Sequence, residues 1–326
     1  MPDKVVLEFE RPIAELENKI TELTALSESG GVALKDEIAA LKQKVEELRM
    51  QIYSNLTSWQ RVQLARHPKR PYTIDYVTNL IEGFIELHGD RQFADDMAIL
   101  TGFGLFRGRP VCVVGHNKGH NTKENLARNF GSPHPEGFRK AIRVMQHAGR
   151  FGLPIFTFLD TAGAYPGIQA EERGQAEAIA RNIRDMFALP VPMIVTVIGE
   201  GGSGGALGIG VGNRVLMQEN AYYSVISPEG CAAILWRSRE EAPTASEIMK
   251  INAASLLKLG VIDEIIPEPL GGAHHDCKTA TEMVGNVIEK HLCELEKMSA
   301  DQLLDDRYKK FRAMGVFLEE ATKGNL

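Results

Sequence analysis

Eight glycines occupy the fourteen positions 199–212, directly after the apolar run 191–198. A strand that breaks into glycines and restarts as a helix of small residues leaves backbone N–H groups without side-chain cover. Because the first N–H groups of a helix have no partner inside it, a negatively charged group can approach and bind them. The stretch therefore predicts a site that binds or stabilises negative charge.

The same residues match several kinds of site. Gly199, Gly201 and Gly204 form G-x-G-x-x-G, and Glu219 follows about 20 residues later, where a dinucleotide-binding fold has its ribose ligand. Residues 201–205 also form G-x-S-x-G, the turn that carries the nucleophile of many serine hydrolases, with Ser203 as the nucleophile.

Two further alternatives use no side-chain chemistry. The backbone amides of Gly204, Gly205 and Ala206 would form an oxyanion hole. Alternatively, the glycines serve only close packing between a strand and a helix, which needs no ligand.

The spacing favours the amide hole among these alternatives. A dinucleotide fold needs a helix after Gly204, but the next apolar run starts near Val215 and three glycines interrupt the interval, each costing roughly 1 kcal/mol against alanine. A hydrolase needs an acid and then a histidine, and Ser203 has more glycines around it than such a turn requires. Candidates for these two partners do follow in the chain, namely Asp263 and His274, His275 or His291.

Composition indicates a globular protein of the cytoplasm. Of 326 residues, 44% are hydrophobic and 25% charged. No apolar run approaches the roughly 18 residues of a membrane span, and the first residues lack the apolar core of a secretory signal. The cysteines at 112, 231, 277 and 293 show no metal-binding or redox spacing, which predicts free thiols, buried at Cys112 and Cys231.

The net charge of −6 argues against a general nucleic-acid-binding protein, but segment 107–150 carries nine Lys and Arg against two acids. Such a segment suits phosphates, a nucleic acid or an acidic partner protein. The alternative is a solvated helix face, because Phe138, Ile142 and Met145 give residues 136–149 an amphipathic pattern.

The elements that must position the glycines follow an α/β alternation. Apolar residues at helical spacing predict a hairpin of two helices over 11–56, either a cap on the main domain or a docking arm for another subunit. Strands are expected at 98–106, 110–116, 154–159, 191–198, 214–219, 221–226 and 261–266, and helices at 135–150, 168–188, 227–236, 244–259 and from about 275 onward. Ligands bind at the carboxyl ends of strands in open α/β sheets, so the loops after 159 and 198 should line one site.

Seven motifs in order along the chain resemble the carboxyltransferase alpha subunits of bacterial acetyl-CoA carboxylase. They are RNFG at 128–131, HPEG at 134–137, DTAGAYPG at 160–167, AEERGQ at 170–175, GEGGSGGA at 199–206, YSVISPEG at 223–230 and EPLGGAH at 268–274. The resemblance implies an α/β fold, the crotonase/ClpP-like superhelix of ββα units, with an N-terminal helical hairpin and a helical C-terminal tail. It implies a helical arm over 1–70 and a crotonase-like carboxyltransferase domain over 71–326.

The resemblance also implies a reaction. A carboxyl group passes from carboxybiotin on a carrier protein to acetyl-CoA, giving malonyl-CoA in the first committed step of fatty-acid biosynthesis. The amides of Gly204, Gly205 and Ala206 would stabilise negative charge on the biotin oxygen, and biotin itself would act as the base.

Further residues receive roles from the same resemblance. Gly163, Ala164 and Tyr165 would line the biotin pocket, with a tight turn as the alternative. Arg173 would meet the transferred carboxylate or pair with Glu171 or Glu172. The candidates for the phosphates of CoA or for the partner subunit are Lys118, Lys123 and Arg128.

The resemblance implies partners that this chain lacks. These are a zinc-containing beta subunit, in an assembly of two alpha and two beta subunits, the biotin carboxyl carrier protein and biotin carboxylase. No metal, no covalently bound cofactor and no activity of the chain alone are expected. The alternatives are a self-sufficient crotonase-type hydratase or hydrolase, and an RNA-binding protein that uses segment 107–150.

Overall fold

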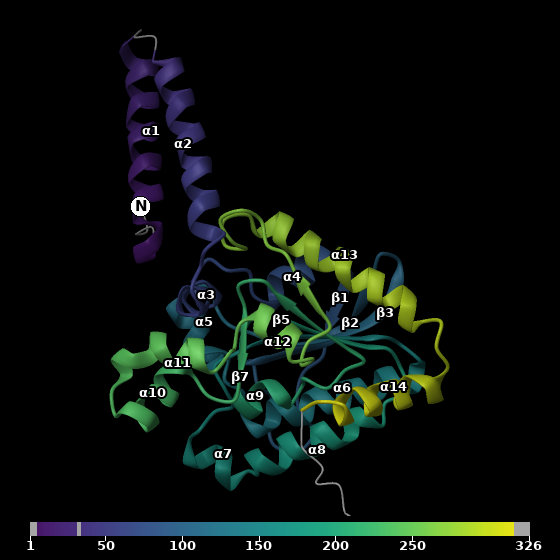
Figure 1. Ribbon diagram of the computed structural model, residues 1–326. Helices are drawn as coiled ribbons and strands as arrows, with labels where there is room; N and C mark the ends of the chain where they lie inside the picture. Colours follow the sequence, from purple (N-terminus) through teal and green to yellow (C-terminus); the bar gives the residue numbers. More distant parts are fainter. Residues whose placement is uncertain (1–4, 31–33, 316–326) are drawn as a thin grey trace, which may run out of the picture.

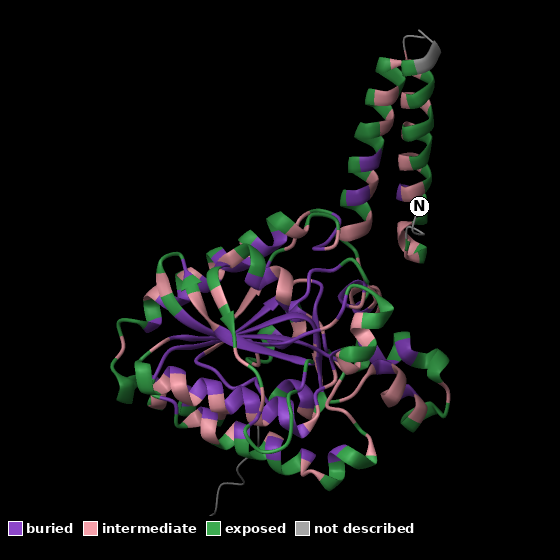
Figure 2. Ribbon diagram, turned by 180° about the vertical axis from the view of Figure 1, so that it is seen from behind, coloured by how far each residue is buried: buried purple, intermediate pink, exposed green. Residues whose placement is uncertain are grey.

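The computed structural model of the protein describes residues 5–30 and 34–315. It consists of a helical hairpin that projects from an α/β body (Figure 1). The hairpin comprises η1 (Glu8–Glu10), α1 (Arg11–Gly30) and α2 (Lys35–Tyr53). Ile13 and Val45 are buried in it, whereas most of its other residues are exposed or half-buried (Figure 2). The apolar stripe predicted from the sequence therefore closes the two helices on each other, and the hairpin does not lie over the body as a cap.

The body is built on one eight-stranded sheet in the order β1-β2-β3-β4-β5-β6-β8, with β7 paired to the end of β5. The first three strands are antiparallel to one another, and the pairings from β3 onward are parallel. The strands are β1 (Ile81–Glu86), β2 (Ile99–Phe106), β3 (Arg109–His116), β4 (Ile155–Thr161), β5 (Met193–Gly202), β6 (Arg214–Gln218), β7 (Tyr222–Ser224) and β8 (Glu264–Ile266).

Helices cover both faces of the sheet, so its central strands β4, β5 and β6 are buried almost throughout, whereas β1 at the edge is mostly exposed (Figure 2). One core joins the sheet to α6 and α8 through Phe138, Met145 and Met186, and the other joins it to α4 and α13 through Tyr76 and Val284. The helices of the body are α3 (Ser58–Ala65), α4 (Thr73–Leu80), α5 (Thr122–Ala127), α6 (Pro135–Phe151), α7 (Ile168–Glu172), α8 (Gln175–Phe187), α9 (Ser203–Leu207), α10 (Pro228–Trp236), α11 (Ala242–Ile248), α12 (Ala253–Lys258), α13 (Cys277–Leu295) and α14 (Ala300–Arg312), with short 3₁₀ turns η2 (Asn129–Gly131) and η3 (Arg239–Glu241).

Most of the predicted elements are present, but two predicted helices are each divided. The helix expected at 168–188 breaks between α7 and α8, because Gly174 takes a left-handed backbone conformation with φ of 81°. The helix expected at 244–259 breaks between α11 and α12, where Lys250 has φ of 53° and the backbone of Ile251 accepts the Tyr223 N–H. The described part of the tail is helical in α13 and α14, and residues 316–326 lie outside the described chain.

The strand expected at 191–198 runs on through the glycines to Gly202. It does so because residues 200–202 pair in parallel with β7, after β6 has paired with the earlier part of β5. The glycine stretch therefore begins as strand, and only Ser203 opens the short helix α9. None of the helices in the described residues is long and apolar enough to cross a membrane.

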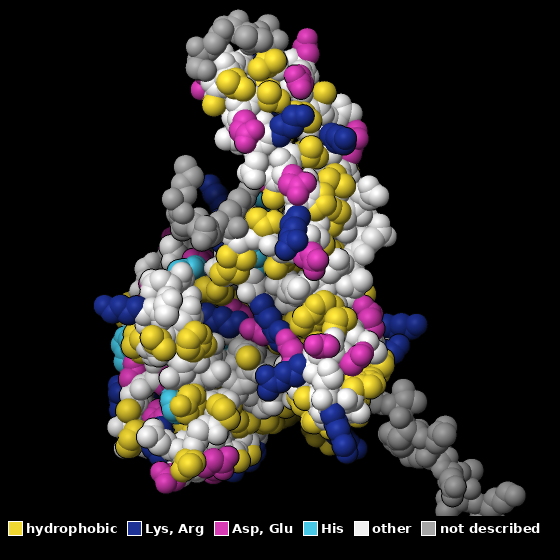
Figure 3. All heavy atoms as spheres, turned by 90° about the vertical axis from the view of Figure 1, so that its left-hand side faces the viewer, with side chains coloured by type: hydrophobic (Ala, Val, Ile, Leu, Met, Phe, Trp, Pro, Cys, Tyr) yellow, Lys and Arg dark blue, Asp and Glu magenta, His cyan; other side chains and the backbone are white. Residues whose placement is uncertain are grey.

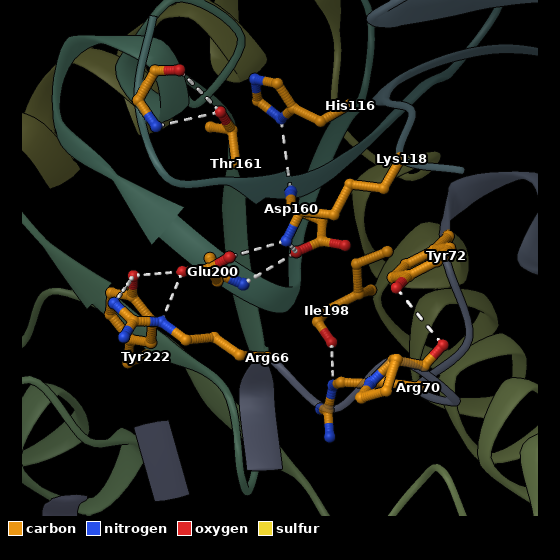
Figure 4. A network of polar contacts seen from close by, with 12 residues as sticks. Arg66, Arg70, Tyr72, His116, Lys118, Asp160, Thr161, Ile198, Glu200 and Tyr222 are labelled. Atoms are coloured by element: carbon orange, nitrogen blue, oxygen red, sulfur yellow. Dashed lines mark hydrogen bonds and ion pairs between the residues drawn. The ribbon is translucent and has the colours of Figure 1, made fainter. Parts of the chain in front are cut away.

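A buried ion pair holds the start of the body to its far end. Arg70, which precedes α4, places Nη2 2.6 Å from Oε1 of Glu268, and both side chains are 1% exposed. The Nε of Arg70 also donates to the carbonyl of Ile198 at 2.6 Å (Figure 4). Burial alone would raise the pKa of Glu268, but the Arg70 guanidinium lowers it to about 2. The pair therefore stays charged and fixes β5 between residues that are 198 positions apart.

Candidate functional site

The loops after β4 and β5 meet backbone to backbone at the carboxyl edge of the sheet. A Cβ on Gly202 would lie 2.2 Å from the carbonyl oxygen of Ala162, and one on Gly205 would lie 2.5 Å from the nitrogen of Ala164. Only glycine permits these approaches. The structure thus brings the two predicted loops together, with Gly163 and Ala164 beside the start of α9.

Helix α9 presents backbone N–H groups at this meeting point. Its N-cap is Gly202, which has no side chain to cap the helix. By helix geometry, the N–H groups of Gly204 and Gly205 have no carbonyl partner within α9, whereas that of Ala206 reaches back to the carbonyl of Gly202. The first two amides are therefore the ones that α9 itself leaves without a partner, with Gly204 half-buried and Gly205 buried.

Other glycines of the stretch serve packing. A Cβ on Gly199 would lie 2.5 Å from Oδ1 of Asp160, and one on Gly201 would lie 2.7 Å from the ring of Tyr223. These close contacts account for two of the glycines without any ligand. The packing alternative and the amide hole thus apply to different positions of the same segment.

Ser203 is exposed and has φ of 54°, a left-handed conformation that is uncommon for a residue with a side chain. The residues proposed as its partners have other contacts. Asp263 accepts from the Val215 N–H at 2.6 Å, His291 Nε2 lies 2.8 Å from Glu264, and His274 and His275 line a cavity at the base of the hairpin. Within the described residues, no hydrogen bond joins Ser203 to a histidine, so these residues form no catalytic triad.

A buried network of charges lies beneath the two loops (Figure 4). The ammonium of Lys118 is 2.7 Å from Oδ1 of Asp160 and 2.8 Å from Oε1 of Glu200. Glu200 also accepts from Nε of Arg66 at 2.8 Å and from the hydroxyl of Tyr222 at 2.7 Å. The network joins β4, β5 and β7 to the segment after α3.

The charges in this network stabilise one another. Burial alone would raise the pKa of Glu200, but Lys118 and Arg66 lower it to about 2. Burial alone would lower the pKa of Lys118, but the carboxylates of Asp160 and Glu200 raise it above its usual range. The Lys118 side chain is only 12% exposed, so its charge is directed to these carboxylates rather than to the protein surface.

His116, at the end of β3, connects the two loops. Its Nδ1 accepts the N–H of Asp160 at 3.3 Å, and its Nε2 lies 3.1 Å from the carbonyl oxygen of Gly205. Because Nδ1 is an acceptor, the ring proton is assigned to Nε2, which donates to Gly205. Burial lowers the pKa of His116 to about 3, so the ring is neutral near pH 7. The sequence motifs give this residue no role.

Tyr165 and Arg173 meet around His134. The rings of Tyr165 and His134 are 4.2 Å apart, and Arg173 Nη2 lies 3.3 Å from Nδ1 of the same histidine. The ion pair of Arg173 is with Glu136, at 2.5 Å, and not with Glu171 or Glu172 as expected for pairing on its own helix. The reason is that Arg173 follows the end of α7, where the chain turns toward the start of α6.

The predicted basic segment is largely neutralised by acids, some within the segment and most from elsewhere in the chain. Arg128 lies 2.9 Å from Glu124 and also donates to the carbonyl of Lys118, whereas Lys123 is exposed and has no ion pair among the described residues. The members of the segment that form ion pairs are Arg107, Arg109, Lys118, Arg128, Arg139 and Lys140.

An apolar cavity of about 480 Å³ lies next to α9. Ser203 and Leu207 line it from the helix, and Tyr223, Ile251 and Phe311 line it from segments that follow. Sequence reasoning missed this cavity, because its walls come from residues spread over more than 100 positions. The neighbouring surface is also apolar, with Val225, Ile234, Leu235 and Ile248 each at least 60% exposed.

One group of side chains in the described residues has a geometry that could hold a metal ion. Glu10, His67 and His274 have donor atoms within 4.8 Å of one another. However, Nδ1 of His67 accepts the N–H of Lys69 and its Nε2 contacts the carbonyl of Val5, while His274 lies 3.2 Å from Glu10. We interpret the group as the link between the hairpin and the body. The expectation that this chain holds no metal stays a prediction.

Comparisons with known proteins agree on one family. Residues 6–315 match the family model described as acetyl co-enzyme A carboxylase carboxyltransferase-like. The chain is 58% identical over 314 residues to the acetyl-coenzyme A carboxylase carboxyl transferase subunit alpha of Syntrophotalea carbinolica, covering 96% of this chain and 99% of that one. It is 56% identical over 313 residues to the protein of the same name from Thermus thermophilus, covering 96% and 99%.

Solved structures show the same fold at low sequence identity. A transcarboxylase 12S structure with methylmalonyl-coenzyme A aligns with a TM-score of 0.55 at 17% identity, over 81% of this chain and 47% of that chain. A chain of a Pseudomonas malonate decarboxylase heterodimer aligns with a TM-score of 0.54 at 17% identity, over 67% and 89%. The predicted crotonase-like α/β fold is confirmed by these similarities.

Proposed function

Since this chain belongs to the family of acetyl-CoA carboxylase carboxyltransferase alpha subunits, we propose that it builds one side of a carboxyltransferase site whose other side comes from a beta subunit. The reaction is transfer of a carboxyl group from carboxybiotin on a carrier protein to acetyl-CoA. The observation that carries the assignment of the site is the backbone contact between the 162–164 loop and α9.

The amides of α9 are the proposed catalytic groups. Carboxybiotin, when bound, supplies the carboxyl group to be transferred. The N–H groups of Gly204 and Gly205 then stabilise negative charge on an oxygen of the reacting groups, and each donor of this kind contributes roughly 2.7–4 kcal/mol. Ala206 follows in the same turn and holds that turn against the sheet, where it is fully buried.

The apolar cavity beside α9 suits the uncharged part of a substrate. Gly163, Ala164 and Tyr165 would bound the biotin side of the site, and Leu207 and Tyr223 the cavity side. A site of this kind keeps water away from the developing charge, which strengthens each N–H contact. No side chain of this chain needs to act as a base, because biotin takes that role.

Lys118 is proposed to stabilise the buried charge network beneath the two loops rather than to bind CoA phosphates. Its ammonium already forms ion pairs with Asp160 and Glu200. Lys123 is exposed and remains the candidate for a phosphate or a partner. Arg173 is held by Glu136 beside His134, from where it would orient Tyr165 and meet the transferred carboxylate.

The apolar surface around α10 is the proposed contact for the beta subunit. Val225, which lines the apolar cavity, is 79% exposed, and Ile234 on α10 is 71% exposed. Figure 3 shows several groups of hydrophobic side chains on this side of the molecule, below the hairpin. Contiguous apolar surface of this kind marks sites of association. The proposal also includes an assembly of two alpha and two beta subunits and binding of the carrier protein. It places the protein in the cytoplasm, which suits the four free cysteines.

The hairpin is proposed as a docking arm for another subunit, and it is shorter than the arm of residues 1–70 expected from the sequence. Its projecting part ends at Tyr53, whereas α3 already packs on the body, where Ser58 donates to Glu247 and Arg66 binds Glu200. Most of the surface of α1 and α2 faces away from the body (Figure 1) and is available to another subunit.

Decarboxylation of malonyl-CoA with biotin as acceptor tests the function, since it is the reverse of the half-reaction. We expect activity in a mixture of this chain and its beta subunit, and none with either alone. The Ser203→Ala variant should keep nearly full activity in the mixture, because only backbone groups are required. Activity of the lone chain, no activity in the mixture, or loss of activity in Ser203→Ala would contradict the proposal.

A further inference from the structure

One carbonyl group of helix α9 is hydrogen-bonded by a side chain from strand β3. It spans only Ser203–Leu207, so nearly all of its peptide groups belong to a helix end. Three of its last four carbonyls are satisfied by the residues that follow: Gly208 N–H bonds Gly204, Ile209 N–H bonds Ala206, and Gly210 N–H bonds Leu207. The carbonyl of Gly205 is met by His116 Nε2 at 3.1 Å.

Burial and further hydrogen bonds hold His116 in position for this contact. Its side chain is fully buried, and Thr73 donates to its backbone carbonyl at 2.5 Å. Its Nδ1 accepts the N–H of Asp160 at the end of β4. Asp160 in turn bonds Lys118 and, through Oδ1, the N–H of Glu200 at 3.0 Å. One imidazole therefore connects α9, through Gly205, to the charge network of Lys118, Asp160 and Glu200; Figure 4 shows the bond from His116 to Asp160 and the network beyond it.

The bond to Gly205 also acts on the amide that follows. The carbonyl of Gly205 and the N–H of Ala206 belong to one peptide group, so a hydrogen bond to the oxygen polarises the N–H that closes the first turn of α9 on the carbonyl of Gly202. It also prevents α9 from rotating or unwinding. Small displacements of hydrogen-bond donors at a reacting centre cost much activity, so a fixed α9 is a requirement of the proposed hole.

We propose that His116 is a positioning residue of the carboxyltransferase site, which acts as a neutral imidazole by fixing α9 against β4. It touches no substrate itself and acts through Gly205. This inference rests on the proposed function and adds to it a side chain for which the sequence motifs gave no role.

The test compares two replacements of similar size. His116→Gln keeps one hydrogen-bond acceptor and one donor, whereas His116→Leu keeps neither. In the mixture with the beta subunit, His116→Leu should lower kcat about 100-fold, with the KM for malonyl-CoA changed less than threefold. His116→Gln should recover at least a tenth of the wild-type kcat. Equal kcat in His116→Leu and wild type, or equal losses in both variants, would overturn the proposal.

Hydrogen exchange separates positioning from general loss of structure. Amide exchange in residues 203–208 should become faster in His116→Leu, while exchange in α13 and in the hairpin stays at the wild-type rate. If exchange rises throughout the body, His116 is needed for the fold and the positioning role fails. Inactive wild-type protein in the mixture would instead refute the proposed function, so the two failures are distinguishable.

Discussion

At the scale of single residues, the glycines of 199–212 differ in purpose although they look alike in the sequence. Gly199 and Gly201 make room for Asp160 and Tyr223, whereas Gly205 lets α9 approach the 163–164 backbone. A motif reading cannot separate them, because the deciding neighbours lie elsewhere in the chain. The sequence predicts the proposed hole from the first N–H groups of a helix, and that site stays a prediction, but the sequence does not predict the separate contribution of each glycine.

A matched pair of alanine substitutions tests this difference. A Cβ on Gly205 would lie 2.5 Å from backbone atoms of the 163–164 loop, whereas one on Gly204 would meet Ile179 at an ordinary 3.6 Å. We expect Gly205→Ala to lower kcat about 100-fold by displacing the loop, and Gly204→Ala to remain within a few-fold of wild type. Steady-state kinetics in the mixture with the beta subunit measures both, with thermal unfolding as the control for folding. Similar kcat values for the two variants would show that the approach of the loops does not matter.

At the scale of elements, alternation of apolar runs and helical patterns predicted β2 through β6 and α6 closely. The differences come from backbone conformations that side-chain patterns do not reveal, such as the left-handed Gly174 and Lys250 that divide two helices. β1 was missed because it follows α4 without a loop and has mostly exposed residues at the edge of the sheet. The links between elements, such as His116 between β4 and α9, depend on tertiary contacts and could not be predicted.

The His116 link makes stability depend on pH. Its pKa is lowered to about 3 by burial, with Lys118 adding to the effect and the Gly205 carbonyl opposing it. Below pH 6.5 the unfolded state binds a proton that the folded state does not, so stability falls as the pH falls toward 3. From pH 7 to pH 5 this one group should cost about 2 kcal/mol.

Urea unfolding at pH 7 and pH 5 measures this effect. The free energy of unfolding should fall less in His116→Gln than in the wild-type protein over this interval. Glu200, whose pKa is about 2, contributes its own loss only as the pH falls below about 4.5 and does not interfere. Equal losses in the two proteins would mean that His116 is not buried as a neutral group.

At the scale of the whole molecule, the family and the α/β class followed from motifs in register along the chain. The cavity beside α9 and the neutralised basic segment did not, because they depend on which distant segments meet. Arg139 and Lys140, for example, are paired with Asp90 and Asp95, which precede them by 49 and 45 positions. Local charge counts therefore overstated the positive surface.

Association with the beta subunit can be tested at the apolar surface. Ile234→Lys puts a charge on α10, where the side chain is 71% exposed, and should weaken binding of the beta subunit at least about tenfold, equivalent to about 1.4 kcal/mol. Phe151→Lys, at an equally exposed apolar position at the end of α6, is the matched control and should bind as the wild-type protein does. Analytical ultracentrifugation of each mixture gives the affinities. A loss of affinity only in the Phe151 variant would place the interface on the other side of the body.

The Arg70–Glu268 pair has a consequence for the synthesis of the protein. The sheet order follows the chain from β1 to β6, so a nascent chain can add one strand after another as it leaves the ribosome. Arg70, however, pairs with the carboxylate of Glu268, which is synthesised 198 positions later. Until then, closing the body would bury an unpaired guanidinium, which costs several kcal/mol. We therefore expect a chain that ends before residue 268 to stay open to proteases, and a chain that includes Glu268 to complete its fold.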